Sequence, residues 1–284
     1  MKYRHSFHAG NFADVHKHVT LLALIAALQK KAKGFLYLDT HAGRGAYDLS
    51  TPNAEAAAGV TRFSAARFAA PELADYARQL AAWHARPGQR HVYPGSPLLA
   101  AAVLRPQDRA VFVELQGGEA HALEELLTMQ HPAGGAALRV ERGDGFERLR
   151  ALLPPPERRG LAFIDPPYEE SGTDFERVGA ALADALRRFA TGVFAAWYPI
   201  KEQHTSAAWL AAAARALPAP MLLSELWLYP RDSRVGLNGS GLLIANPPWQ
   251  LAERMREWLP ELKGCLGGGP AAGTTVRMLS ESPP

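Results

Sequence analysis

This chain of 284 residues has a single cysteine, no long apolar run and no large excess of one charge. Its one cysteine, Cys265, cannot form an internal disulfide, which is typical of a protein in a reducing compartment. The longest apolar run, residues 19–28, is shorter than the roughly 20 residues that span a bilayer, and no signal peptide precedes it. We therefore expect a cytoplasmic protein that does not enter a membrane.

The positive charge that the chain carries is concentrated near its start. The net charge is only +3 and the pI is near 9.0. Residues 1–33 nevertheless hold six Lys and Arg side chains against a single acid, Asp14. Such a segment favours an anionic partner, although on charge alone a solvated surface is an equal alternative.

Strand and helix patterns alternate along most of the chain. The strand patterns are at 35–39, 110–114, 137–141, 161–165 and 192–198, and the helix patterns are at 13–31, 97–104, 119–129, 145–153 and 175–189. This alternation predicts a parallel sheet with helices on both faces. Residues 222–229 and 241–245 predict an antiparallel hairpin. The expected fold class is therefore α/β, the class I methyltransferase variant of the Rossmann fold.

One interval in this pattern is too long. In dinucleotide-binding folds, the acid that binds the ribose follows the glycine loop by about 20 residues. Here Glu114 ends the second strand 75 residues after Asp39. Residues 49–96 are alanine-rich and helical in pattern, and the interval shortens to 27 when these 48 residues are removed. We interpret 49–96 as an inserted helical subdomain.

The rest of the chain reads as one domain. We expect a single methyltransferase domain over residues 1–284. Residues 267–284 are rich in Gly and Pro and are expected to be a flexible tail, with room for an edge strand at 274–279.

The sequence Asp165-Pro166-Pro167-Tyr168 directly follows a predicted strand. Both prolines have φ fixed at about −65° and lack an N–H, so this corner is stiff. The Asp165 carboxylate and the Pro166 carbonyl can then accept the two hydrogens of an exocyclic amine on a planar base, and Tyr168 can stack on that base. An ordinary proline-rich turn is the alternative interpretation.

Other chemical groups follow the remaining predicted strands. Residues 39–45 form a glycine loop, whose backbone can approach a ligand closely, and Glu114 can bind ribose hydroxyls. Asp144 and Gly145 stand where such folds hold an adenine amino group. Glu114 as a surface acid and Asp144 as a helix N-cap are equal alternatives. No Walker lysine follows the loop, so we do not expect a triphosphate. Because parallel strands end at one edge of a sheet, the combination with Asp165 predicts a site for S-adenosylmethionine (SAM).

The ten histidines do not predict a metal site. His16 and His18 are two residues apart and point about 200° apart on a helix. His5 and His8 could share an ion, but no Cys or acid cluster completes a site. We interpret His18 and His41 as polar groups near the carboxylate and ammonium of SAM, with core or capping histidines as the alternative.

A second corner of the same type occurs at residues 246–249, Asn-Pro-Pro-Trp. It follows a strand of the predicted hairpin that runs antiparallel to the others, so its end points to the opposite edge of the sheet. We therefore expect a structural role for Asn246.

Seven segments together closely resemble the RlmJ family of bacterial large-subunit rRNA adenine-N6 methyltransferases. They are residues 3–11 (YRHSFHAGN), 13–15 (ADV), 17–18 (KH), 36–43 (LYLDTHAG), 93–98 (YPGSPL), 165–169 (DPPYE) and 197–199 (WYP). The resemblance covers residues 1–249 and is weak across the insertion and after Pro260. Phe12 and His16 stand where we expect His and Leu in relatives, so no role is given to His16.

The resemblance implies a SAM-dependent enzyme that methylates N6 of one adenine in 23S rRNA. We also expect naked or early-assembly RNA as the substrate, a monomeric enzyme, and no metal or membrane. The residues are Asp165 for catalysis; His18, His41, Ser96, Glu114, Asp144, Gly145 and Asp165 for the cofactor; and Tyr3 for the substrate, joined by Pro166 and Tyr168 of the corner described above.

Two rival hypotheses remain. The same chemistry could act on DNA adenine or on a protein glutamine. A non-catalytic RNA-binding assembly factor could also have kept the fold, although the intact Asp165, Glu114 and glycine loop argue against it.

Overall fold

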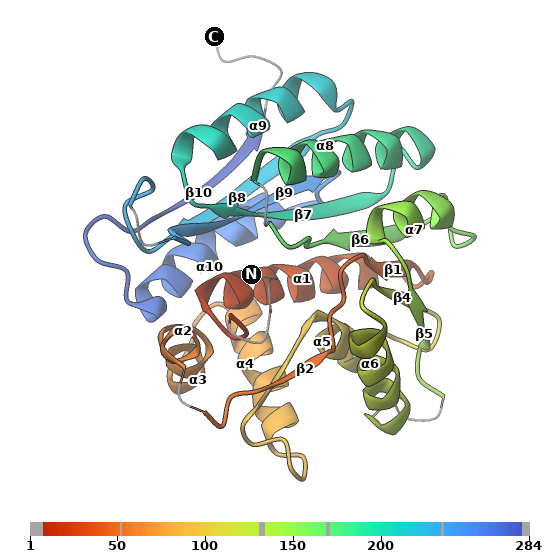
Figure 1. Ribbon diagram of the computed structural model, residues 1–284, viewed down its shortest axis with the longest axis horizontal. Coiled ribbons are helices and arrows are strands. Elements are labelled where there is room, and N and C mark those ends of the chain that lie inside the picture. Colours follow the sequence, from red (N-terminus) through yellow and green to blue (C-terminus); the bar gives the residue numbers. More distant parts are fainter. Residues whose placement is uncertain (1–7, 52, 131–133, 169–170, 234–235, 280–284) are drawn as a thin grey trace.

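The computed structural model describes residues 8–51, 53–130, 134–168, 171–233 and 236–279. These residues form an eight-stranded mixed sheet in the order β10-β8-β9-β7-β6-β1-β4-β5, covered by helices on both faces (Figure 1). The strands are β1 (Leu36–Asp39), β4 (Arg109–Glu114), β5 (Ala137–Arg142), β6 (Gly160–Ile164), β7 (Val193–Ile200), β8 (Met221–Trp227), β9 (Gly239–Ala245) and β10 (Gly273–Leu279).

The sheet has the predicted mostly parallel arrangement. β5, β4, β1, β6 and β7 are parallel, and β9 runs antiparallel to both β7 and β8. The central strands are apolar because both of their faces are covered. The predicted α/β fold with its antiparallel hairpin is confirmed.

Helices lie on both faces of the sheet (Figure 1). α8 (Ser171–Arg188) and α9 (Gln203–Ala216) cover one face, and α7 (Gly145–Leu152) packs against α8. The other face carries α1 (Phe12–Gln29), α5 (Ser96–Val103), α6 (Gly117–Gln130) and α10 (Leu251–Leu266).

Helix α1 is capped by Asn11. The side-chain oxygen of Asn11 accepts hydrogen bonds from the backbone N–H groups of Ala13 (2.9 Å) and Asp14 (3.0 Å). The Asp14 side chain is buried and accepts from the Gly10 N–H at 2.9 Å. Asp14 is therefore available to pair with a buried cation.

The segment predicted as an insertion is helical, and a pair of short strands connects it to the sheet domain. β2 (Ala46–Asp48) pairs antiparallel with β3 (Val92–Pro94). Between them lie α2 (Ala54–Ala56), a π-helical turn (Ala57–Thr61), α3 (Arg62–Ala65) and α4 (Pro71–His84). These helices pack on α1 and α10 and share the main hydrophobic core. Ser96 already begins α5, so the helical segment joins the sheet domain before residue 96.

Within the tail expected at residues 267–284, residues 273–279 are ordered as a strand. They form β10, which pairs with β8 from Gly273 opposite Trp227 to Leu279 opposite Met221. The edge strand expected at 274–279 is therefore present, because β8 offers its free edge. Residues 280–284 lie outside the described residues.

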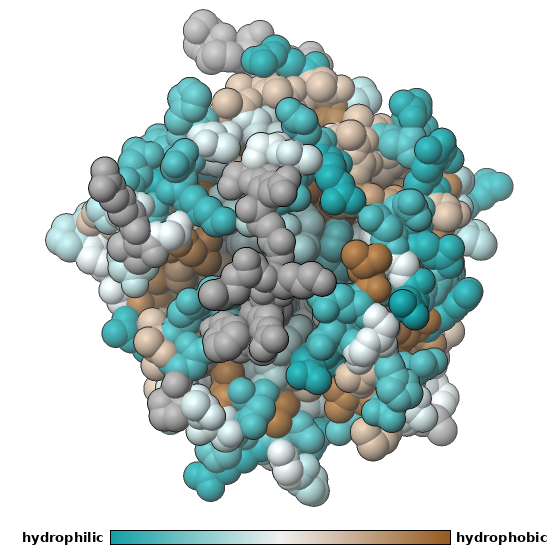
Figure 2. All heavy atoms as spheres, viewed as in Figure 1, coloured by the Kyte–Doolittle hydropathy of each residue, from teal (hydrophilic) through white to brown (hydrophobic). Residues whose placement is uncertain are grey.

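The surface shows no large hydrophobic area on the face seen in Figure 2, as far as the described residues cover it. Hydrophilic side chains there are interrupted by small separate hydrophobic groups. Among the described residues, no helix combines the length and the hydropathy needed to cross a membrane.

Candidate active site

A cavity of about 570 Å³ lies at the carboxyl ends of β6, β1, β4 and β5. Eight residues proposed from the sequence line it: His18, His41, Ser96, Glu114, Asp144, Gly145, Asp165 and Pro166. The order of the strands sets the order of these groups along the cavity. Asp144 follows β5, Glu114 ends β4, His41 follows β1 and Asp165 follows β6. Segments far apart in the sequence thus form one site, as sheet topology requires.

Glu114 is held by the backbone on both sides of its carboxylate. One oxygen accepts the N–H of Gly43 at 2.9 Å, and the other accepts the N–H of Gln116 at 2.7 Å. Gly43 has φ 62°, a conformation that favours glycine. A carboxylate fixed in this way keeps lone pairs for two further donors, such as a pair of hydroxyl groups.

Asp144 caps helix α7 and also lines the cavity. Its Oδ1 accepts from the N–H groups of Phe146 (2.8 Å) and Glu147 (3.2 Å), and its Oδ2 accepts from Arg177 at 3.2 Å. The N-cap alternative is therefore realised, and it holds the carboxylate at the cavity wall. At Gly145, a Cβ would lie 2.0 Å from the Thr40 carbonyl oxygen, so only glycine lets this turn approach the β1 loop.

The rings of His41 and Phe146 meet edge to face beside Asp144, with an interplanar angle of 67°. Their ring centroids are 5.1 Å apart, and the Arg177 guanidinium lies 4.9 Å from the Phe146 centroid. Burial lowers the pKa of His41 to about 4, so the imidazole is neutral at pH 7. The Thr40 hydroxyl lies 2.8 Å from its Nδ1. A neutral aromatic wall is suited to a planar heterocycle.

Ser96 is fixed at the start of α5 by a buried acid. Its hydroxyl donates to Asp39 Oδ2 at 2.6 Å, and the Tyr37 hydroxyl donates to the same oxygen at 3.1 Å. Burial raises the pKa of Asp39 to about 6. Asp39 thus acts on the cavity through Ser96.

Lys17 is the group that sequence reasoning missed. Its Nζ lies 2.6 Å from Asp165 Oδ2, 2.9 Å from Asp14 Oδ1 and 4.5 Å from the centroid of the Trp197 ring. Only 4% of the Lys17 side chain is exposed, so it is not part of a basic surface as its place in the sequence suggested. The spacing of Asp14 and Lys17, three residues apart on α1, indicates only their mutual ion pair and not the pairing of Lys17 with Asp165.

Tyr168 does not offer its ring to the cavity. Its hydroxyl donates to the Trp197 carbonyl at 2.7 Å, and its ring lies against Phe175 and Trp197, with centroids 5.1 and 5.6 Å away. The prediction that Tyr168 offers an exposed stacking face is therefore wrong. Its ring packs in the core, and its hydroxyl is hydrogen-bonded there. Pro167 lines the cavity instead. Tyr3 lies outside the described residues.

Asn246 lies at the opposite edge of the sheet, as predicted. Its side-chain amide donates to the carbonyls of Ala190 and Gly192, both at 2.8 Å, just before β7 begins. These bonds favour the structural role expected for Asn246, and the two Pro-Pro corners point to opposite edges because β9 is antiparallel to β7.

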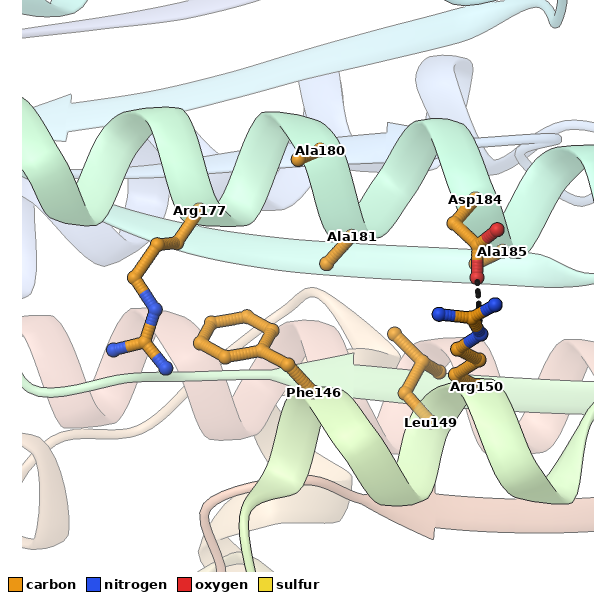
Figure 3. Close-up of a pocket in the computed structure, with 8 residues that line it drawn as sticks. All are labelled: Phe146, Leu149, Arg150, Arg177, Ala180, Ala181, Asp184 and Ala185. Carbon is orange, nitrogen blue, oxygen red and sulfur yellow. Dashed lines mark ion pairs between the residues drawn. The ribbon is translucent and has the colours of Figure 1, made fainter.

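A second cavity of about 380 Å³ lies between α7 and α8 (Figure 3). Phe146, Leu149 and three alanines supply its apolar walls, while Arg150 and Asp184 pair with each other at 3.9 Å. Phe146 and Arg177 line both cavities, and in Figure 3 they point toward each other. The polar groups that can do chemistry lie in the larger cavity, which we take as the candidate active site.

The histidines of the described residues form no metal site. No group of three or more His, Cys, Asp or Glu side chains with metal-binding geometry occurs among these residues. His16 is fully buried between Ser240 and Ser224, with its ring nitrogens 3.0 Å from each hydroxyl.

Comparison with known proteins gives consistent results. The model of the family described as "Ribosomal RNA large subunit methyltransferase D, RlmJ" matches residues 32–278. Ribosomal RNA large subunit methyltransferase J of Escherichia coli (strain K12) is 40% identical over 270 residues, 94% of each chain. The protein of that name from Haemophilus influenzae is 38% identical over 271 residues, again 94% of each. The crystal structure of protein LPL1258 from Legionella pneumophila has a TM-score of 0.86 and 34% identity, and the match covers 96% of this chain and 99% of that one.

Proposed function

Because the chain belongs to the RlmJ family of ribosomal RNA large subunit methyltransferases, we propose that it transfers a methyl group from SAM to N6 of one adenine in 23S rRNA. The observation that carries this proposal is the position of Asp165. Its carboxylate lines the same cavity as Glu114 and Asp144 and is held by Lys17. One cavity thus combines groups suited to a nucleoside with an acceptor suited to an amine.

The residues of the cavity fit SAM. The volume of about 570 Å³ is within the range of small-molecule sites. Glu114 has lone pairs left for the ribose hydroxyls, and Asp144 stands beside the neutral wall of His41 and Phe146, where an adenine ring would lie. His18 and Asp14 line the cavity from α1 and suit the amino-acid end of SAM. When bound, SAM supplies an electrophilic methyl group.

Asp165 acts on the adenine amine in this proposal. Lys17 occupies one carboxylate oxygen and holds the group in place. The other oxygen and the Pro166 carbonyl accept the two N6 hydrogens and orient the nitrogen. As N6 gains positive charge, the preorganised carboxylate stabilises it. The proton then leaves toward Asp165 or water.

The target adenine must leave its stack to reach Asp165, which costs a few kcal/mol in a duplex and less in an unpaired loop. Stacking on an aromatic ring can return about 1–3 kcal/mol. Tyr168 can provide this only after its hydroxyl leaves the Trp197 carbonyl. Pro166 and Pro167 already line the cavity and can contact the base without such a change.

A methylation assay tests the proposed function. Wild-type enzyme with labelled SAM and a 23S rRNA transcript should form N6-methyladenosine at one position. Asp165→Ala should lower the single-turnover rate by about 10²–10³-fold, because a preorganised polar group at the reacting centre is lost. Asn246→Ala is the matched control from the other Pro-Pro corner and should retain the wild-type rate in the folded fraction. Methylation of DNA or protein in place of rRNA would refute the proposed substrate.

The remaining parts of the proposal concern the form of substrate and enzyme. We assign the substrate as naked 23S rRNA or an early assembly intermediate, and the enzyme as a cytoplasmic monomer. Comparing methylation rates on naked RNA and on mature ribosomal particles tests the form of the substrate. Light scattering during turnover tests whether the enzyme is a monomer. Failure to bind SAM would favour an RNA-binding assembly factor.

A further inference from the structure

The hydroxyl groups of two buried tyrosines connect the helical segment to the candidate active site. His18 Nδ1 lies 2.7 Å from the Tyr93 hydroxyl, which lies 3.0 Å from the Tyr76 hydroxyl. Tyr76 comes from α4 and Tyr93 from β3, whereas His18 is on α1. All three side chains are buried, and His18 also lines the cavity. None of the roles proposed above involves either tyrosine.

The protons in this chain have one favourable order. Burial raises the pKa of Tyr76 and of Tyr93, so both phenols keep their protons. Within the described residues, the Tyr76 hydroxyl has one hydrogen-bond partner, Tyr93. If Tyr93 donated to Tyr76, the Tyr76 proton would be buried without an acceptor, which is unfavourable. Tyr76 therefore donates to Tyr93, and Tyr93 donates to Nδ1 of His18.

We infer that Tyr76 and Tyr93 are positioning residues that hold His18 as the neutral tautomer protonated at Nε2. An imidazole that accepts at Nδ1 carries its proton on the other nitrogen. The stacked arrangement of the His18 and Tyr93 rings, with centroids 5.7 Å apart, also fixes the orientation of the imidazole. The structure thus assigns His18 the role of a hydrogen-bond donor.

A donor at this place selects the carboxylate of the amino-acid end of SAM. Asp14 lies one helical turn before His18 and lines the same cavity, and its carboxylate, already paired with Lys17, keeps lone pairs that can accept from the ammonium group. An Nε2 acceptor would compete with Asp14 for the ammonium and leave the carboxylate unpaired. This assignment rests on the proposed function, because the ligand is SAM. The helical segment then has a role in cofactor binding, because Tyr76 on α4 is connected to His18 through Tyr93.

The tautomer can be measured without any ligand. In protein labelled with ¹⁵N-histidine, two-bond ¹⁵N–¹H spectra distinguish the tautomers, and the His18 signal is assigned from its loss in His18→Gln. We expect a single Nε2–H tautomer in the wild type and a mixture in Tyr93→Phe. If Tyr93→Phe does not fold, Tyr76→Phe is the second variant. It keeps Tyr93 but removes the Tyr76 proton that makes Tyr93 donate to His18, so it should also show a mixture of tautomers. An Nδ1–H tautomer in the wild type would overturn the inference.

Binding measurements test the consequence for SAM. Calorimetry should show that Tyr93→Phe weakens SAM by about five- to tenfold, the effect of one hydrogen bond. The affinity for 5′-methylthioadenosine, which lacks the amino-acid end, should stay within about twofold. Tyr198→Phe removes a similar buried phenol hydroxyl, bonded to Glu225 at 2.8 Å, and should leave both affinities unchanged.

Two results count against the inference. An equal loss of both ligands in Tyr93→Phe would show that Tyr93 only supports the fold. Unchanged binding of SAM in a folded Tyr93→Phe would show that the hydrogen bonds from Tyr76 through Tyr93 to His18 do not affect the ligand. If the wild type binds neither ligand, the proposed cofactor is wrong. The tautomer of His18 in the free protein still decides whether Tyr76 and Tyr93 position this histidine.

Discussion

At the scale of single residues, the buried amino group of Lys17 determines how the Asp165 carboxylate is held. It lies between Asp14 and Asp165 and over the ring of Trp197. Removing one partner of a buried ion pair leaves an uncompensated charge, which is strongly unfavourable. The carboxylate is therefore in place before any substrate binds, and the enzyme does not need substrate binding to orient it.

Glu114 should contribute mainly to the binding of SAM. In Glu114→Ala we expect SAM affinity to fall roughly ten- to a hundredfold, because hydrogen bonds to charged groups contribute about 1.5–3 kcal/mol. Isothermal calorimetry on the folded variant measures this directly. Glu119→Ala, at the same cavity but about one-third exposed, is the control and should change affinity less. Equal affinities of wild type and Glu114→Ala would contradict the ribose assignment.

His16 should make stability depend on pH. Burial lowers its pKa from 6.5 to about 3, so between these values the unfolded chain binds a proton that the folded protein does not. The contribution of His16 to stability is full above pH 6.5 and is lost as pH falls. From pH 7 to pH 5 this loss amounts to about 2 kcal/mol.

Denaturant titrations at pH 7 and pH 5 test this effect. His16→Gln should show a smaller loss of stability between the two pH values than the wild type, whatever its absolute stability. His121→Gln, at an exposed histidine on α6, should behave as the wild type does. Parallel pH profiles for wild type and His16→Gln would show that His16 is not held neutral.

At the scale of elements, the start of α7 depends on close approach to the loop after β1. A Cβ at Gly145 would lie 2.0 Å from the Thr40 carbonyl oxygen, so Gly145→Ala must move α7 away from that loop. We expect a loss of about 1–3 kcal/mol in unfolding free energy and weaker SAM binding, because Asp144 and Phe146 move with the helix.

A second glycine near a helix start provides the control for Gly145. Gly118 lies at the beginning of α6, and a Cβ there would meet no atom within 4 Å. Gly118→Ala should therefore leave SAM affinity unchanged and stability equal or slightly higher. Chemical denaturation measures the stability of both variants, and calorimetry measures their affinity for SAM. A Gly145→Ala protein that binds SAM normally would contradict the assigned position of α7.

At the scale of the whole molecule, the basic charges near the start of the sequence do not form one patch. Lys17 is buried at the active site. Lys30, Lys31 and Lys33 follow the carboxyl end of α1, whose 18 residues span about 27 Å. These three lysines therefore lie far from the cavity, and among the basic residues near the start of the sequence we expect those before α1 to contact RNA closer to the target adenine.

The salt dependence of RNA binding should separate these two groups of charges. Deleting residues 2–4, which removes Lys2 and Arg4, should lower the slope of log affinity against log salt by roughly 1.4 for single-stranded RNA. It should also slow methylation. Changing Lys30, Lys31 and Lys33 to Gln should leave slope and rate nearly unchanged. Filter binding across a salt series measures both, and the reverse pattern would place the RNA on the other edge of the sheet.

The extent to which sequence predicts this site follows from the kind of contact. The positions of Glu114, Asp144 and Asp165 could be predicted, because each follows a parallel strand and topology brings strand ends together. The Lys17–Asp165 pair joins residues 148 positions apart, and no local pattern specifies it. The inward turn of Tyr168 likewise depends on core packing against Phe175 and Trp197, which only the tertiary structure determines.

The order of strands has a consequence for self-association. β5 and β10 stand at the two ends of the sheet, where a strand of another copy could add. β5 carries Arg139, Glu141 and Arg142, and β10 carries Arg277 between Val276 and Met278. Edge charges disfavour the flat, apolar pairing from which amyloid-like aggregates grow. The sheet therefore ends on both sides in strands that discourage further growth.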